Sequence, residues 1–88
     1  MPSKEELKQR ACAEIDARAD KLINISQNIL NNPEPGFREI KTSHLVASIF
    51  QEANIPYRDG LAITGVKAEL QGGSAGPCVA VLGEMDSL

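Results

Sequence analysis

Apolar residues in the first third of the chain recur at the three- and four-residue spacing that indicates an amphipathic helix. Ser3 and Glu6 fit a capping box at its start, where the hydroxyl accepts an amide hydrogen bond and the glutamate reaches back. The helix is predicted to continue to about Leu30. Its expected buried stripe consists of Leu7, Ala11, Ile15, Ala19, Leu22 and Ile29, widened by Ile23 and Leu30.

Two prolines and a glycine between residues 31 and 36 end this helix. Each proline lacks an amide donor and restricts the residue before it, and glycine adds turn freedom. A second helix is predicted over residues 37–54. We assign Glu34 to turn geometry or solvent, Gly36 to chain reversal and Phe37 to an apolar anchor for this helix. The expected buried stripe of the second helix is Thr42, Leu45, Val46, Ile49, Phe50 and Ala53.

The pattern of the remaining residues favours strands. Residues 55–58 are predicted to form a short edge strand or extended connector, and residues 65–71 alternate apolar and polar side chains as a half-buried strand does. After a glycine-rich turn, residues 78–82 are apolar without alternation, which predicts a central strand covered on both faces. The predicted fold class is therefore α/β, with two N-terminal helices followed by about three strands of a mixed sheet.

The predicted central strand needs more protein around it than these elements supply. Such a strand requires neighbours on both sides and helices on both faces. We therefore expect residues 1–88 to be part of a larger domain, or to complete the sheet with a partner. An open strand edge would allow pairing with another chain, including a homo-oligomer of this one.

Composition narrows the class of protein. The apolar and charged fractions, 42% and 24%, are those of an ordinary globular domain. The net charge is −3 and basic residues do not cluster with aromatic ones, so a nucleic-acid partner is not expected. The longest apolar run is too short to span a bilayer, and the first twenty residues lack the apolar core of a signal peptide. A cytoplasmic protein without membrane partners is expected, in which Cys12 and Cys78 are reduced, buried core residues.

Candidate chemistry lies at the end of the predicted central strand, where open α/β sheets place their active sites. Glu84 and Asp86 are two residues apart, so their side chains would point the same way. Such carboxylates suit metal ligation, support of a ligating histidine or general base catalysis, but the residues alone favour a solvated acidic turn after a strand. His44 is interpreted as a surface residue, since no second histidine or cysteine is near it. The glycines at 72, 73 and 76 lack the following helix that a phosphate site requires.

Four segments resemble, in the same order, the metal-dependent amidohydrolase and aminoacylase family of metallopeptidases, which includes carboxypeptidase G and aminobenzoyl-glutamate hydrolase-like enzymes. Residues 32–39 read NPEPGFRE and are followed by TS at 42–43, similar to HPELGFEE…TS. TGV at 64–66 resembles the family's entry into a strand, and residues 81–88, VLGEMDSL, are similar to the end of ALRADMDAL.

The resemblance implies the start of a three-layer zinc-peptidase catalytic domain that hydrolyses the amide bond of N-acyl or aminobenzoyl amino acids or dipeptides. Two divalent metal ions, zinc or manganese, would be held by later segments, so no metal ligand is assigned within this chain. Carboxypeptidase-type members read GHxD where this chain has Glu84 and Asp86. The resemblance implies a supporting role near the site for Asp86 and a weaker one for Glu84, with the 88-residue chain alone inactive. The alternatives are a non-catalytic α/β module that binds a partner through an open sheet edge, or a small α/β domain of other purpose.

Overall fold

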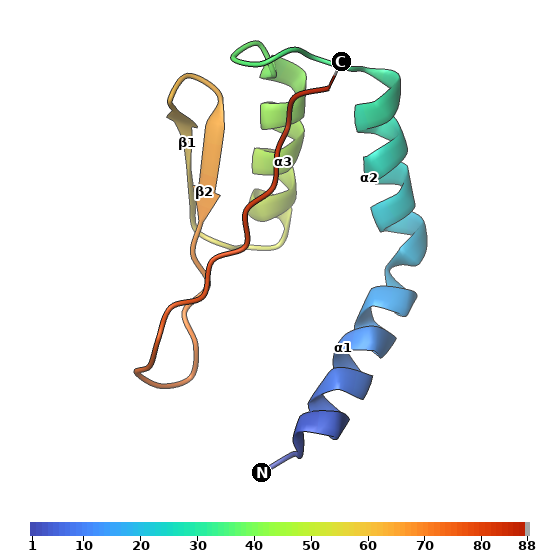
Figure 1. Ribbon diagram of the computed structural model, residues 1–88, viewed down its shortest axis with the longest axis vertical. Helices are drawn as coiled ribbons and strands as arrows, with labels where there is room; N and C mark the ends of the chain where they lie inside the picture. Colours follow the sequence, from blue (N-terminus) through green and yellow to red (C-terminus); the bar gives the residue numbers. More distant parts are fainter. Residues whose placement is uncertain (88) are drawn as a thin grey trace. The chain divides into compact units, whose positions relative to one another are not determined.

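The computed structural model describes residues 1–87 as two compact units, Met1–Asn32 and a second unit that begins at Pro33 (Figure 1). The first unit contains helices α1, Lys4–Ala17, and α2, Ala19–Asn31. The predicted start is confirmed, because the Ser3 hydroxyl accepts a hydrogen bond of 3.2 Å from the Glu6 amide.

The prediction of one continuous first helix is wrong, because the helix breaks at Arg18. The Arg18 amide bonds to the Ile15 carbonyl, three residues back, rather than continuing the four-residue ladder. The Arg18 guanidinium instead donates to the Glu14 carbonyl, at 3.3 Å, and also pairs with the Glu14 carboxylate. A side chain inserted into the ladder is a recognised cause of a helix break.

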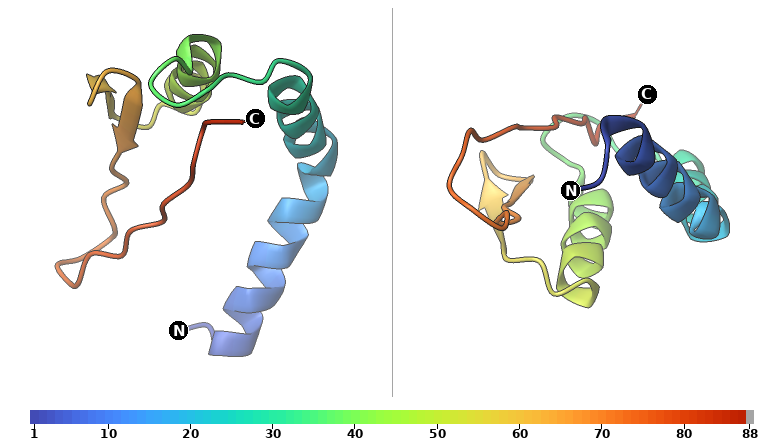
Figure 2. Two further views of the ribbon diagram at one scale, coloured as in Figure 1. Left: turned by 45° about the horizontal axis from the view of Figure 1, so that its top comes forward. Right: turned by 90° about the horizontal axis from the view of Figure 1, so that it is seen from below.

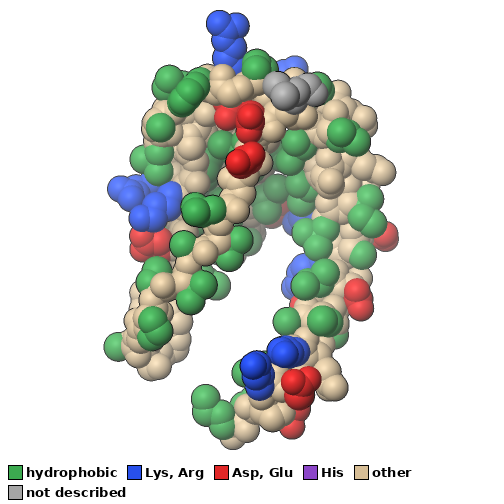
Figure 3. Space-filling model, viewed as in Figure 1, with side chains coloured by type: hydrophobic (Ala, Val, Ile, Leu, Met, Phe, Trp, Pro, Cys, Tyr) green, Lys and Arg blue, Asp and Glu red, His purple; other side chains and the backbone are tan. Residues whose placement is uncertain are grey.

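The apolar stripe of the first unit faces solvent, so its predicted burial is wrong. Neither α1 nor α2 contains a buried residue, and only Ala19, Ile25 and Ile29 are half-buried. Hydrophobic side chains are accordingly visible on the surface in Figure 3. Periodicity gives a helix an apolar face, but burial needs an opposing surface, and no residue of α1 or α2 is buried against one. The large exposed residues of this stripe are Leu7, Ile15, Leu22, Ile23 and Leu30.

The second unit packs helix α3, Ile40–Glu52, beside an antiparallel hairpin of β1, Tyr57–Leu61, and β2, Gly65–Ala68 (Figures 1 and 2). The rings of Phe50 and Tyr57 stack at 6.4 Å between centroids. Ala47 is a buried hydrophobic residue of this unit, and Thr42, Ser43 and Thr64 are buried in it as well.

The second predicted helix is confirmed, with a later start than residue 37. Gly36 and Phe37 form the predicted chain reversal, but Phe37 has a φ of 62° and is 67% exposed, so it does not anchor the helix. Of the predicted stripe, Thr42 is buried and Ala53 is exposed, while its four larger members are half-buried. The predicted stripe is therefore confirmed along most of its length, but most of its side chains are only partly buried.

The hairpin confirms a strand in each of the first two predicted strand regions, with β1 displaced toward residue 61, and the mixed sheet is not confirmed among residues 1–87. Tyr57 pairs with Ala68 and Leu61 with Gly65, with an irregularity between Arg58 and Leu61. Gly65 is needed there, because a Cβ atom at this position would lie 2.6 Å from the Leu61 carbonyl oxygen. The two strands are antiparallel because a short turn joins them directly.

The predicted central strand at residues 78–82 does not form in the described part of the chain, and with it the three-strand count is not confirmed. These residues are exposed, Val81 at 96%, and both Cys12 and Cys78 are exposed rather than buried. A strand exists through its hydrogen-bonded neighbour, and among residues 1–87 β1 and β2 pair only with each other. The apolar run 78–82 has the composition of a buried segment, but burial also requires a neighbouring surface. No helix within residues 1–87 is long and apolar enough to cross a membrane.

Candidate functional site

Glu84 and Asp86 lie in the extended C-terminal segment, outside any helix or strand. Exposure alternates there: Glu84 and Asp86 are exposed, and Met85 and Ser87 are half-buried. Both carboxylates are therefore directed to solvent with the apolar Met85 between them. Each is accessible to a ligand.

The main chain next to Asp86 is anchored to the turn before α3. The Ser87 amide donates a 2.8 Å hydrogen bond to the Glu34 carbonyl, across 53 residues of chain. Figures 1 and 2 show the C-terminal segment doubling back to reach this turn. The two segments that carry the family resemblance at either end of this unit are thus brought into contact.

The side chain of Glu34 binds the start of α3. Its Oε2 accepts from the Lys41 amide at 3.0 Å, and its Oε1 accepts from the Thr42 amide at 2.7 Å and the Thr42 hydroxyl at 2.8 Å. The first amides of a helix have no partner within it and favour a negative charge. The Lys41 amide is the main cause that lowers the pKa of Glu34 below its usual 4.5, with the Thr42 hydrogen bonds adding to it against partial desolvation. Glu34 was expected to act in turn geometry, and it does so by capping the start of α3.

A second carboxylate, that of Glu39, connects α3 to the hairpin. Glu39 is only 8% exposed, and its Oε1 accepts a 3.3 Å hydrogen bond from the buried Thr64 hydroxyl. The turn between β1 and β2 contains Ala62 and Ile63 just before Thr64. Both have a positive φ, which a β-branched residue such as isoleucine rarely adopts. Sequence reasoning did not find this pair, because 25 residues separate its members and no periodicity relates them.

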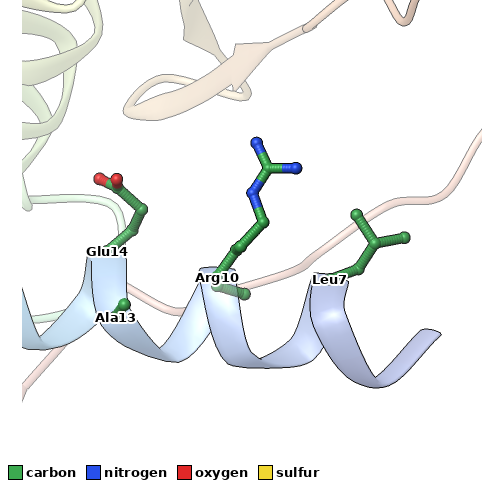
Figure 4. Close-up of a pocket in the computed structure, with 5 residues that line it drawn as sticks. Leu7, Arg10, Ala13 and Glu14 are labelled. Carbon is green, nitrogen blue, oxygen red and sulfur yellow. The ribbon is translucent and has the colours of Figure 1, made fainter. Parts of the chain in front are cut away.

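Two cavities of the described chain lie away from both candidate carboxylates. One of about 190 Å³ is formed by α3 and the hairpin and is lined in part by His44. His44 is exposed, which confirms its prediction as a surface residue. Another of about 390 Å³ lies along α1, where Leu7, Arg10 and Glu14 project from one helix (Figure 4). A groove formed by a single helix has no opposing wall to orient a ligand. Neither cavity contains Glu84 or Asp86.

The residues present do not make a complete metal centre. No group of three or more histidine, cysteine or acidic residues within residues 1–87 could hold a metal ion. Glu84 and Asp86 offer oxygen donors that suit divalent cations, but catalytic zinc takes three protein ligands and a water. These two carboxylates could act on a metal only together with ligands outside residues 1–87.

Several known proteins with similar sequences are hydrolases by name. The chain is 43% identical over 68 residues to the IAA-amino acid hydrolase ILR1-like 6 of Arabidopsis thaliana, which covers 76% of this chain and 14% of the relative. It is 34% identical over 70 residues to the thermostable carboxypeptidase 2 of Saccharolobus solfataricus, covering 78% and 18%. It is 32% identical over 69 residues to the N-acetylcysteine deacetylase of Bacillus subtilis, covering 77% and 18%.

The chain thus spans less than a fifth of the length of these relatives. No profile of a known protein family matches it. No solved structure matches it either.

Proposed function

Because this chain belongs to the amidohydrolase and aminoacylase family, we propose that it forms the N-terminal part of the catalytic domain of a metal-dependent amidohydrolase. The proposed reaction is hydrolysis of the amide bond of an N-acyl or aminobenzoyl amino acid or a dipeptide. The relatives support this class, since their names describe an IAA-amino acid hydrolase, a carboxypeptidase and an N-acetylcysteine deacetylase.

The observation that carries the proposal is the hydrogen bond between the Ser87 amide and the Glu34 carbonyl. It joins the segments around residues 32–39 and 81–87, which resemble the family in sequence and lie far apart along the chain. It also places Asp86 one residue from a fixed point while leaving its carboxylate exposed. A residue that supports a reacting group needs this combination of an anchored main chain and an available side chain.

In this proposal Asp86 supports the reaction centre and Glu84 contributes less. Two zinc or manganese ions would activate water and polarise the amide carbonyl. Their ligands would come from outside residues 1–87, because the described residues do not supply a full set. The 88-residue chain is therefore proposed to hydrolyse nothing by itself.

The test compares the complete protein that carries this sequence with the 88-residue chain. Both are assayed with N-acetyl amino acids, aminobenzoyl-glutamate and dipeptides, before and after metal removal by a chelator. The complete protein should hydrolyse at least one of these classes, lose that activity without metal and regain it with zinc or manganese. Metal-independent hydrolysis, hydrolysis by the short chain, or no hydrolysis by the complete protein would contradict the proposal.

A second candidate function is a non-catalytic module that binds a partner through its sheet edge. It is favoured by the hairpin, whose outer edges have no ladder partner among residues 1–87, and by the exposed Leu70 and Val79 in the segment that follows. Light scattering on the 88-residue chain separates the two functions. A tight oligomer with exchange-protected β1 or β2 amides favours the module, and a monomer with unprotected edges contradicts it.

A further inference from the structure

Glu34 makes two different contacts, one through its side chain and one through its main chain. The carboxylate binds the first turn of α3, and the carbonyl binds the Ser87 amide beside Asp86. The residue therefore connects a helix of the small core to the segment that carries the candidate carboxylates.

The side-chain contact restricts the turn strongly. Both carboxylate oxygens are used, with three hydrogen bonds of 2.7–3.0 Å from Lys41 and Thr42. Hydrogen bonds to a charged acceptor are roughly twice as strong as those between neutral groups. Because two donors come from the α3 backbone, the carboxylate is held relative to the helix rather than to a mobile side chain.

The direction of the Glu34 carbonyl follows from this restraint and from its neighbours. Pro33 and Pro35 flank Glu34, and a residue before proline is confined to extended backbone. With the side chain held and the backbone confined, the carbonyl has little freedom. It accepts a 2.8 Å hydrogen bond from the Ser87 amide. Ser87 lies at the end of a segment, residues 69–87, that forms no helix or strand.

We propose that Glu34 is a positioning residue for Asp86, which it holds in place through the Ser87 main chain. The inference rests on the proposed function, because positioning matters only if Asp86 works near the reacting groups. In this proposal Glu34 acts through Asp86 and has no contact of its own with the substrate. A misplacement of about 1 Å at a reacting group can lower a rate by about a hundredfold, so an anchor of this kind has a measurable effect.

A double-mutant cycle in the complete protein tests whether Glu34 affects kcat through Asp86. Glu34→Ala should lower kcat by about tenfold in the wild-type background, and by less than about twofold in an Asp86→Asn background, since coupled residues are not additive. A residue that only stabilises the fold would lower activity by the same factor in both backgrounds, and that result overturns the proposal. Glu69→Gln, which removes one exposed carboxylate from the same unit, is the matched control and should leave kcat unchanged.

Hydrogen exchange in the same protein tests the geometric half independently of activity. Glu34→Ala should speed exchange in the peptide containing Ser87 by about five- to tenfold, the factor for one net hydrogen bond. Thr42→Val should do so less and Thr42→Ser should not, because serine keeps the hydroxyl donor to Glu34. Unchanged exchange at Ser87 in folded Glu34→Ala overturns the inference. If the wild-type protein hydrolyses nothing while exchange responds as stated, the proposed function fails and the Glu34 anchor stands without it.

Discussion

Thr42 gives the same carboxylate oxygen of Glu34 two hydrogen bonds, from its amide at 2.7 Å and from its hydroxyl at 2.8 Å. This pair closes the turn 33–39 onto α3 although eight residues separate its members. The cap on α3 therefore comes from a residue outside the usual capping position, and the N-cap residue Glu39 is left to bind Thr64 instead.

Acid should weaken the Glu34 cap. The pKa of Glu34 is lowered in the folded chain, so its contribution to stability is complete above the unfolded value, near 4.5, and is lost as pH falls through the folded value. Glu34→Gln should lower the melting temperature by a few degrees at pH 7, and the difference from wild type should shrink below pH 4.5. Thermal melts across this range check the prediction, and a difference that grows toward low pH would contradict the sign.

Loss of the Thr64 hydroxyl should destabilise the second unit. Thr64→Val keeps the shape of the side chain but removes the donor to the buried Glu39 carboxylate. The expected cost is about 1–3 kcal/mol, and the 3.3 Å length of the bond favours the lower end. Urea unfolding measures it, with Thr64→Ser as the control that retains the hydroxyl. Equal stability of the valine and serine variants would show that this hydrogen bond adds nothing.

A methyl group at Gly65 should disrupt the hairpin. The new Cβ would approach the Leu61 carbonyl oxygen to 2.6 Å, a backbone contact that cannot move aside cheaply. Gly65→Ala should cost about 1–3 kcal/mol, the usual range for overpacking. Gly72→Ala has open space around the new Cβ and is the matched control. Circular dichroism and urea unfolding distinguish the two, and a Gly65→Ala variant as stable as Gly72→Ala would rule out the clash.

Removal of the Ser3 hydroxyl should fray the start of α1. The Glu6 amide would lose its acceptor, at a cost of about 0.5–2 kcal/mol for a helix N-cap. Ser3→Ala should increase amide exchange in the first turn of α1, while Ser3→Asp, which keeps an acceptor, should not. Because the residues of α1 are exposed, packing cannot mask the effect. Equal exchange in both variants would mean that the cap does not stabilise the helix.

Replacement of Asp86 should reduce activity in the complete protein more than replacement of Glu84 does. Groups that support metal ligands typically account for about 10–100-fold in activity, so Asp86→Asn is expected to lower kcat by that factor. Glu84→Gln, the same chemical change two residues away, should lower it less. Steady-state kinetics on the best N-acyl substrate measures both. A larger loss at Glu84 would reverse the assignment made from the resemblance.

The local elements of this chain follow from its sequence. The cap at Ser3, the helix stop between residues 31 and 36, the helix that ends at Glu52 and the alternating strand after Thr64 each depend on residues within one or two turns of each other. Proline and glycine restrict or free their own backbone, and a hydroxyl caps an amide three residues ahead, so these effects are readable from spacing alone. The family resemblance likewise rests on short segments in order.

Tertiary structure decided what spacing cannot express. The pairs Glu39–Thr64 and Ser87–Glu34 join residues 25 and 53 positions apart. Residues 78–82 have the pattern of a central strand but no ladder partner in the described chain, so they remain exposed. An apolar pattern is a property of one segment, whereas burial and strand pairing require a second surface. The sequence therefore determined the helix start at Ser3, the helix that ends at Glu52, the strand after Thr64 and the family, while the fold decided that Glu34 holds both α3 and the main chain beside Asp86.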